Sequence, residues 1–158
     1  MRVWRISNYV DLSGIGGLEV AGRWHEKGRL VVYAADHPSS ALLEALVHLE
    51  IDVEDVPDNF QLIEIDVPAA LQIDSIDEAE LEKLSVGWRD DVRITRAQTS
   101  SWFQELKTPI LRVPSVILPG VSNYLINPLH VDAARIVVVS ARRHPYDVRL
   151  FRQPLRTG

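Results

Sequence analysis

The chain has 158 residues, which is the size of one globular domain. Apolar residues make up 46% and charged residues 25%, so the composition excludes collagen-like, low-complexity and wholly disordered chains. The formal charge of −5 argues against a general nucleic-acid binder, and the absence of cysteine excludes disulfides, zinc–thiolate sites and thiol nucleophiles. The sequence contains no signal-peptide pattern and no run of about 20 apolar residues, which predicts a cytoplasmic protein without a membrane span.

The first half of the chain predicts a strand followed by an unusually apolar helix. Residues 29–35 (RLVVYAA) are β-branched and apolar, which favours a buried strand, and the polar turn at 25–28 predicts a hairpin with the GRW sequence before it. The helix predicted at 39–49 has an apolar arc of about 240° on a helical wheel, so we expect it to be mostly buried. Its narrow polar stripe, which must face water or a cleft, consists of Ser40, Glu44 and His48.

An acidic loop is predicted at 52–59, and a half-exposed strand follows it because Ile63 and Ile65 alternate with Glu64 and Asp66. The later predicted elements are helices at 74–84 and 95–106 and strands at 111–118, 136–140 and 148–151. Strands and helices mix without strict βαβ alternation. The fold class is therefore predicted to be α+β, with one domain covering residues 1–158.

Three segments nearly match familiar functional motifs, but each lacks a required residue or spacing. The glycines at 14–17 resemble a dinucleotide-binding loop, but Glu19 stands where its third glycine belongs, so we expect a plain flexible turn. The HEKGR sequence at 25–29 lacks the second histidine of a zinc-protease motif, and residues 120–124 do not complete a nucleophile elbow. The five histidines stand far apart, and no metal site is predicted.

Two dense segments remain, and together they resemble a known family. The first contains GRWH from Gly22, a strand tyrosine at Tyr33 and ALLE ending at Glu44; the second contains the Pro-Ser pair at 114–115 and the NYLINP sequence at 123–128. This ordered set resembles the RES domain family, the toxin component of RES–Xre type II toxin–antitoxin pairs. The resemblance covers nearly the whole chain and implies a single RES domain with a fold related to ADP-ribosyltransferase toxins.

The resemblance also implies a site that consumes NAD as substrate and needs no further cofactor. The family's Arg, Tyr and Glu correspond to Arg23, Tyr33 and Glu44, which are therefore the expected catalytic residues. Arg23 and Tyr33 are also expected to bind substrate. The other substrate-binding candidates are Ser115, Asn123 and Asn127.

These residue types suit the chemistry. An arginine presents a planar fork of donors that fits a pyrophosphate, and a tyrosine ring can stack on nicotinamide. Cleavage of the nicotinamide–ribose bond develops oxocarbenium character, which a carboxylate such as that of Glu44 stabilises. Each residue also has an ordinary interpretation: Arg23 as a surface charge, Tyr33 as a core residue, and Glu44 as a solvated group paired with His48.

The leading hypothesis is a bacterial toxin that degrades NAD by hydrolysis or phosphorolysis and arrests growth. The alternatives are a protein ADP-ribosyltransferase toxin and a non-catalytic RES-like binding module. The resemblance implies an Xre-type helix-turn-helix antitoxin that covers the NAD cleft, in an assembly with two or more toxin copies as one arrangement. Because the chain is acidic, DNA contacts are expected to come from the antitoxin and not from the toxin alone.

Overall fold

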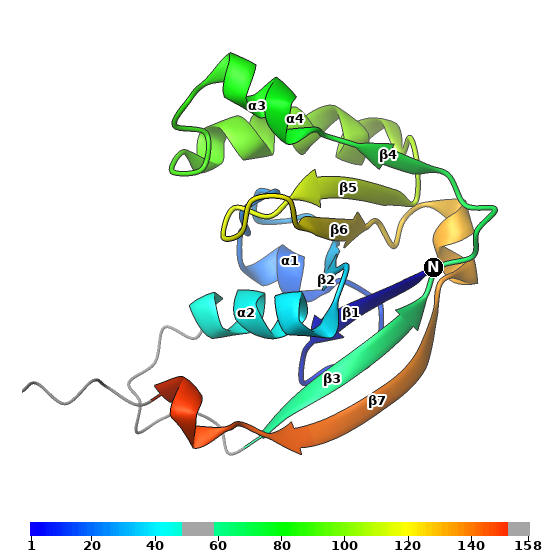
Figure 1. Ribbon diagram of the computed structural model, residues 1–158. Helices are drawn as coiled ribbons and strands as arrows, with labels where there is room; N and C mark the ends of the chain where they lie inside the picture. The colour runs from blue at the N-terminus through cyan, green and yellow to red at the C-terminus, as the bar shows by residue number, and fades with distance from the viewer. Residues whose placement is uncertain (49–58, 152–158) are drawn as a thin grey trace, which may run out of the picture.

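The computed structural model describes residues 1–48 and 59–151. Within these residues the chain forms a seven-stranded sheet with the order β4-β5-β6-β2-β1-β3-β7 (Figure 1). The pair β4–β5 is parallel and the other neighbouring pairs are antiparallel. The strands are β1 (Arg2–Ile6), β2 (Val32–Ala35), β3 (Asn59–Asp66), β4 (Ile73–Ser75), β5 (Ile110–Pro114), β6 (Ser122–Ile126) and β7 (Val137–Pro145).

The helices lie against different parts of this sheet. In Figure 1, α3 and α4 run together beside β4 and β5, whereas α2 lies near β1 and β2. The helices are α1 (Gly16–Glu19), α2 (Pro38–His48), α3 (Glu78–Leu84) and α4 (Val92–Glu105), with 3-10 helices at Val131–Arg135 and Val148–Phe151. The predicted α+β class is confirmed.

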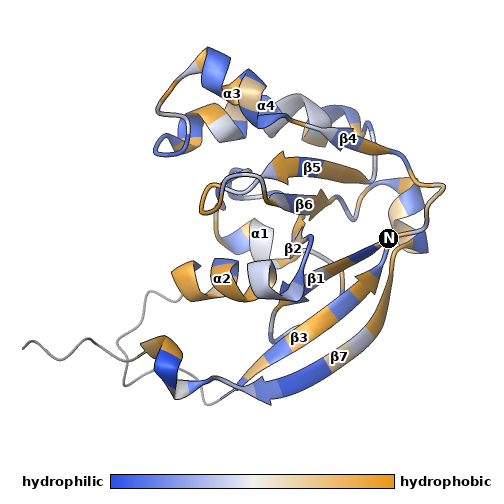
Figure 2. Ribbon diagram, in the orientation of Figure 1, coloured by the Kyte–Doolittle hydropathy of each residue, from blue (hydrophilic) through white to orange (hydrophobic). Residues whose placement is uncertain are grey.

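Two hydrophobic clusters form because neighbouring residues of a strand point to opposite faces of the sheet. On β5, Ile110 belongs to one cluster with Ile63 and Ile65 of β3, while Leu111 belongs to the other. The second cluster contains the buried aromatic residues Trp24, Trp88, Trp102 and Phe103. The alternation predicted for β3 is confirmed, since Ile63 and Ile65 are fully buried, and Figure 2 shows it as alternating colours along the strand.

Several predicted elements are wrong, each for an identifiable reason. The GRW sequence is not a hairpin partner of β2, because β2 pairs with β1 and β6. Residues 148–151 form a 3-10 helix, whose first turn is stabilised by the Asp147 carboxylate accepting from the Arg149 backbone N–H. The segment predicted as a helix from residue 74 begins as the end of β4, which pairs with β5, and becomes helical only at Glu78.

Strands β1 and β6 were not predicted from the sequence, and α2 is less buried than its apolar arc predicts. Only Ala41 of this helix is buried, Leu42 and Leu46 are half-buried, and Val47 is exposed. The helix is therefore partly covered along residues 41–46 instead of being enclosed. The acidic loop predicted at 52–59 lies outside the described residues, apart from Asn59, which begins β3.

Candidate active site

Glu44 projects from α2 toward the ends of β5 and β6, where two buried polar residues meet it. The Ser115 hydroxyl donates to Glu44 Oε1 over 2.9 Å, and the Asn123 side-chain N–H donates to the same oxygen over 2.6 Å. In the described part of the chain, Oε2 accepts no hydrogen bond from the protein. The described residues therefore fix the carboxylate through one oxygen only.

Ser115 and Asn123 differ in how many of their hydrogen-bonding groups are already paired within the described residues. The Ser115 oxygen also accepts from the backbone N–H groups of Ile117 and Leu118, at 3.1 and 3.2 Å, so its hydrogen-bonding groups are used by the protein. The side-chain oxygen of Asn123 is buried and has no partner among residues 1–48 and 59–151. A buried acceptor without a partner is costly unless a ligand or water satisfies it. Asn123 is thus suited to receive a donor from a bound molecule.

Two adjoining cavities lie beside this group. A cavity of about 200 Å³ is lined by Glu44 and Asn123, and a larger one of about 580 Å³ is lined by Arg23. The larger volume falls within the roughly 300–1,000 Å³ usual for small-molecule sites. The cavities adjoin because three residues line both of them: Arg5, Tyr33 and His48.

Arg5 supplies a cation at the junction of the cavities. Its guanidinium makes one long hydrogen bond within the described chain, 3.4 Å to the Asp11 carbonyl oxygen. Burial lowers the pKa of Arg5 from its usual value, with the nearby Asp11 carboxylate acting in the opposite direction. A half-buried guanidinium with most of its donors unused in the described chain is well suited to bind an anion. Arg5 was not among the site residues expected from the sequence.

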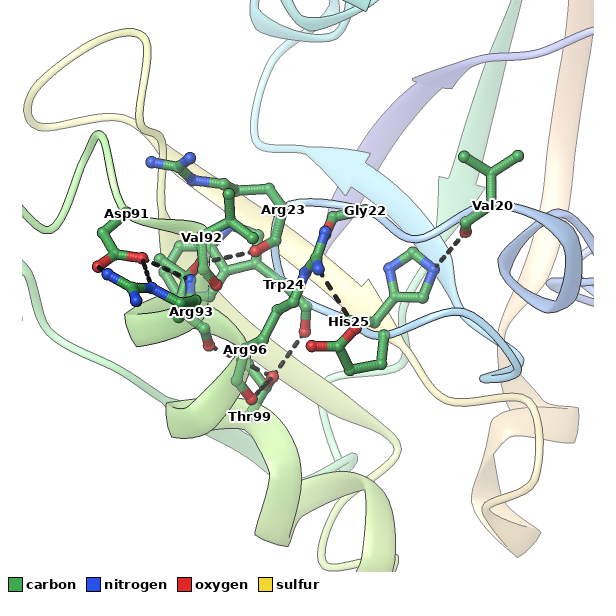
Figure 3. Close-up of polar contacts among 12 residues, drawn as sticks. Val20, Gly22, Arg23, Trp24, His25, Asp91, Val92, Arg93, Arg96 and Thr99 are labelled. Atoms are coloured by element: carbon green, nitrogen blue, oxygen red, sulfur yellow. Dashed lines mark hydrogen bonds and ion pairs between the residues drawn. The ribbon is translucent and has the colours of Figure 1, made fainter.

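Arg23 is half-buried, and its side chain extends away from His25 in Figure 3. One terminal nitrogen donates weakly to the Trp88 carbonyl oxygen over 3.4 Å, and the buried Nε has no partner among the described residues. Burial lowers the pKa of the Arg23 guanidinium, whereas Asp90 and Asp91 partly restore it. Arg23 is therefore a second guanidinium with donors to spare.

The backbone that carries Arg23 is held in place by α4. The carbonyl oxygens of Gly22, Arg23 and Trp24 accept hydrogen bonds from Arg96 Nε (2.9 Å), Thr95 Oγ1 (2.6 Å) and Thr99 Oγ1 (2.6 Å), respectively. Figure 3 shows α4 alongside this segment. These bonds hold the segment against α4, where Gly22 makes an isolated bridge with His25 and no ladder with β2.

Tyr33 lines both cavities, and its hydroxyl is bound by two protein groups. It accepts from the Trp24 backbone N–H over 3.1 Å and lies 2.8 Å from His25 Nδ1. Burial raises the pKa of the Tyr33 hydroxyl, which therefore remains protonated. The His25 ring is 5% exposed and its other nitrogen lies 3.1 Å from the Val20 carbonyl oxygen.

Of the expected site residues, Asn127 stands apart from the others. It lines a separate small cavity near Phe103, and its side-chain oxygen accepts from the Leu129 backbone N–H, which shapes the turn after β6. The cavities beside Glu44 are lined by Asn123 and not by Asn127. Arg23, Tyr33, Glu44, Ser115 and Asn123 are brought together.

The glycine segment expected to be a flexible turn is instead an ordered wall of the larger cavity. Gly14 adopts a positive φ of 70°, and Gly17 is buried with its carbonyl oxygen accepting from the backbone N–H groups of Gly28 and Arg29. A Cβ atom at Gly17 would lie 2.1 Å from the Arg29 carbonyl oxygen, so no larger residue fits there. The glycines of this segment therefore allow close packing of the backbone.

Residues 1–48 and 59–151 contain no group of three or more His, Cys, Asp or Glu side chains positioned to hold a metal ion. Among the helices in those same ranges, none has the length and apolar character needed to cross a bilayer.

The fold and site define an α+β protein whose cleft combines a fixed carboxylate with two under-used guanidinium groups. The chain belongs to the RES domain family, whose model matches residues 2–149. It is 47% identical over 151 residues to a protein from Pseudomonas putida named Toxin Res, covering 96% of this chain and 100% of that protein. It is 39% identical over 158 residues to the Prs ADP-ribosylating toxin of Sphingobium sp., covering 95% of this chain and 96% of that protein.

A solved structure supports the same fold. A chain from the crystal structure of the M. tuberculosis MbcT–MbcA toxin–antitoxin complex matches with a TM-score of 0.71, covering 95% of this chain and 86% of the other. The two sequences are 18% identical, so this likeness concerns the fold alone.

Proposed function

We propose that this protein is the toxin of a toxin–antitoxin pair and that it consumes NAD by cleaving the bond between nicotinamide and ribose. The observation that carries the proposal is the geometry of Glu44, whose Oε1 is held by Ser115 and Asn123 while Oε2 is left to a ligand. The relatives named as toxins, one of them as ADP-ribosylating, support the same class of activity.

In this proposal the larger cavity takes the pyrophosphate-bearing part of NAD, with Arg5 and Arg23 as the groups that bind its charge. The smaller cavity takes the nicotinamide and its ribose beside Glu44 and Asn123. The side-chain oxygen of Asn123 accepts a hydrogen bond from the carboxamide N–H or a ribose hydroxyl. Ser115 is assigned to orienting Glu44, since its hydroxyl is already used.

The carbon–nitrogen bond breaks and its electron pair leaves with the nicotinamide ring nitrogen. The ribosyl carbon becomes positively charged, and the Glu44 carboxylate stabilises it. Water or inorganic phosphate then bonds to that carbon, and water loses its proton to solvent. We favour this net degradation over transfer to a protein, although the Sphingobium relative named as an ADP-ribosylating toxin supports transfer as the second candidate.

Product identity tests the proposal. Purified protein is incubated with NAD, with and without phosphate, and nicotinamide release is followed by mass spectrometry. ADP-ribose indicates hydrolysis, and a phosphorylated ADP-ribose that appears only with phosphate indicates phosphorolysis. ADP-ribose attached to protein indicates transfer. If wild-type protein releases no nicotinamide from NAD under any of these conditions, including with a cell lysate as acceptor, the enzymatic proposal is wrong and a binding module remains.

The expected partner is an antitoxin of the Xre helix-turn-helix type. A fold shared with a chain of a toxin–antitoxin complex supports an antitoxin partner, and the net charge of −5 supports assigning DNA contact to that partner. Co-purification with the neighbouring gene product, followed by light scattering, tests the partner and the proposed presence of two toxin copies. Tight DNA binding by the isolated chain would contradict the assignment.

A further inference from the structure

His25 contacts two walls of the larger cavity at once. Its Nε2 faces the Val20 carbonyl oxygen at the end of α1, and its Nδ1 faces the Tyr33 hydroxyl on β2. Val20 and Tyr33 both line the larger cavity, as does His25 itself. The chemistry proposed for Glu44 does not explain the role of this histidine, because Glu44 lines the smaller cavity and His25 lines only the larger one.

The contacts determine which ring nitrogen holds the proton. A carbonyl oxygen only accepts hydrogen bonds, so Nε2 must donate to Val20 and therefore carries hydrogen. In a neutral ring Nδ1 is then an acceptor, and burial favours the neutral ring by lowering the pKa of His25. The Tyr33 hydroxyl must accordingly donate its proton to Nδ1, while its oxygen accepts from the Trp24 backbone N–H.

The surroundings leave the His25 ring little freedom to move. A Cβ atom at Gly22 would lie 2.6 Å from both Nδ1 and Cε1 of His25 and 2.7 Å from the Tyr33 hydroxyl oxygen. One at Gly17 would lie 3.1 Å from Nε2. The ring is thus confined between two glycines, and the carbonyl of Gly22 is itself held by Arg96.

We propose that His25 is a positioning residue for Tyr33: in its Nε2–H tautomer, Nδ1 accepts a hydrogen bond from the Tyr33 hydroxyl. This bond fixes the tyrosine so that its ring, not its hydroxyl, is presented to NAD. This inference rests on the proposed function for the identity of the ligand. Tyr33 lines both cavities. In this proposal the nicotinamide-bearing end of NAD packs against the face of the Tyr33 ring.

A matched pair of variants separates this role from a merely structural one. His25→Asn places an amide oxygen near the former Nδ1 and keeps an acceptor for Tyr33, whereas His25→Gln reaches toward the former Nε2 and keeps a donor for Val20. We expect KM for NAD to stay within about 3-fold of wild type in His25→Asn and to rise about 10-fold in His25→Gln, the effect of losing about one hydrogen bond. Equal KM values in the two variants, or a lower KM in His25→Gln than in His25→Asn, would overturn the proposal.

Tyrosine variants test the same coupling. If the Tyr33 hydroxyl interacts only with His25, Tyr33→Phe and His25→Gln remove the same interaction. The KM of the double variant should then exceed that of the more damaging single variant by no more than about 2-fold. Tyr33→Leu, which removes the ring, is expected to raise KM by 10-fold or more beyond Tyr33→Phe. If Tyr33→Phe raised KM as much as Tyr33→Leu does, the hydroxyl itself would bind NAD, which contradicts the proposal.

A final measurement needs no ligand. Nitrogen-15 NMR of the imidazole side chains in the unliganded wild-type protein should show His25 protonated at Nε2 and unprotonated at Nδ1. A His25 protonated at Nδ1 would overturn the inference whatever the protein does to NAD. A wild-type protein that leaves NAD intact but has the expected tautomer would refute the proposed function while leaving the His25–Tyr33 geometry in place.

Discussion

Asn123 donates to Glu44 Oε1 over 2.6 Å although 79 residues separate the two positions. Ser115, which is 71 residues from Glu44, donates to the same oxygen. A carboxylate that receives two donors on one oxygen has a fixed orientation, and a fixed group needs no rearrangement as charge develops on the substrate. The arrangement therefore favours an electrostatic role for Glu44 over that of a solvated helix residue.

The first prediction concerns the charge of Glu44. Glu44→Gln keeps the size of the side chain and an oxygen that can accept from Asn123, but removes the negative charge. We expect kcat for NAD consumption to fall about 10²–10³-fold with little change in KM, because the lost interaction strengthens in the transition state. Steady-state kinetics measures this, with the exposed Glu105→Gln as control. A folded Glu44→Gln protein with the parental rate would remove Glu44 from the mechanism.

The second prediction assigns Ser115 to orientation. Ser115→Ala should lower kcat about 10-fold through a less well-fixed Glu44, with KM nearly unchanged, because its hydroxyl is already used by protein groups. Ser140→Ala is a matched control, since Ser140 also donates to a glutamate, Glu64, on a part of the sheet that does not line the cavities. A rise in KM without loss of kcat would indicate that Ser115 binds NAD directly.

The third prediction concerns the two guanidinium groups. Arg23→Ala and Arg5→Ala should each raise KM about 10- to 100-fold, the effect of losing a charge-assisted hydrogen bond of about 1.5–3 kcal/mol. Arg23→Lys should restore binding only in part because an ammonium lacks the planar fork. Arg135→Ala, which removes an exposed arginine paired with Asp132, should leave KM unchanged. Unaltered NAD binding by both Arg5→Ala and Arg23→Ala would exclude the larger cavity as the pyrophosphate site.

Much of the site could be predicted from local sequence. The helical wheel of α2 isolates Glu44 on a polar stripe, and this stripe does face a cleft that Glu44 and His48 line. The strand containing Tyr33 is recognisable from its β-branched neighbours. These features depend on residues close in sequence, and periodicity reports them directly.

The rest depends on strand pairing that no local pattern encodes. Ser115 and Asn123 meet Glu44 because β5 pairs with β6 in a register that sets Val113 opposite Asn123. The choice between Asn123 and Asn127 follows from that register, since Asn127 lies past the end of β6. Arg5 was missed because β1 is short and carries two arginines, which weakens its apolar signal, while its place inside the sheet comes from pairing with β2 and β3.

The fourth prediction tests the bond between α4 and the segment that carries Arg23. Thr99→Val removes the hydroxyl that donates to the Trp24 carbonyl oxygen, leaving that oxygen buried without its partner. We expect a loss of about 1–3 kcal/mol in the free energy of unfolding together with a higher KM for NAD. Thr108→Val is the control: Thr108 also donates to a carbonyl oxygen, that of Ile110, and accepts from Trp102 Nε1, but it makes no hydrogen bond to the segment that carries Arg23. It should lose stability without a change in KM.

If Thr99→Val and Thr108→Val raised KM equally, the effect would follow from a general loss of stability. The prediction that Thr99 positions the Arg23 segment would then be wrong. Denaturant unfolding and kinetics are therefore measured on the same preparations. A Thr99→Val protein with unchanged KM would likewise show that Arg23 holds its position without this bond.

The fifth prediction concerns pH and follows from the buried ring of His25. Burial lowers the pKa of His25 in the folded state below its ordinary value of 6.5, with Arg96 acting in the same direction and Glu26 against it. As pH falls through 6.5 the unfolded chain binds a proton that the folded protein does not, so the free energy of unfolding decreases toward acid. The stabilising contribution is present above pH 6.5 and is lost below it.

Denaturant unfolding of wild type and His25→Asn at pH 7.5 and 5.5 measures this contribution. The asparagine variant lacks the titrating ring, so its stability should decrease less between the two pH values than that of wild type, even if it starts from a lower value at pH 7.5. Thr108→Val, which is destabilised without loss of a histidine, should keep the wild-type decrease. An equal decrease in wild type and His25→Asn would mean that His25 binds its proton equally in both states, and the neutral buried ring on which the Tyr33 geometry depends would be wrong.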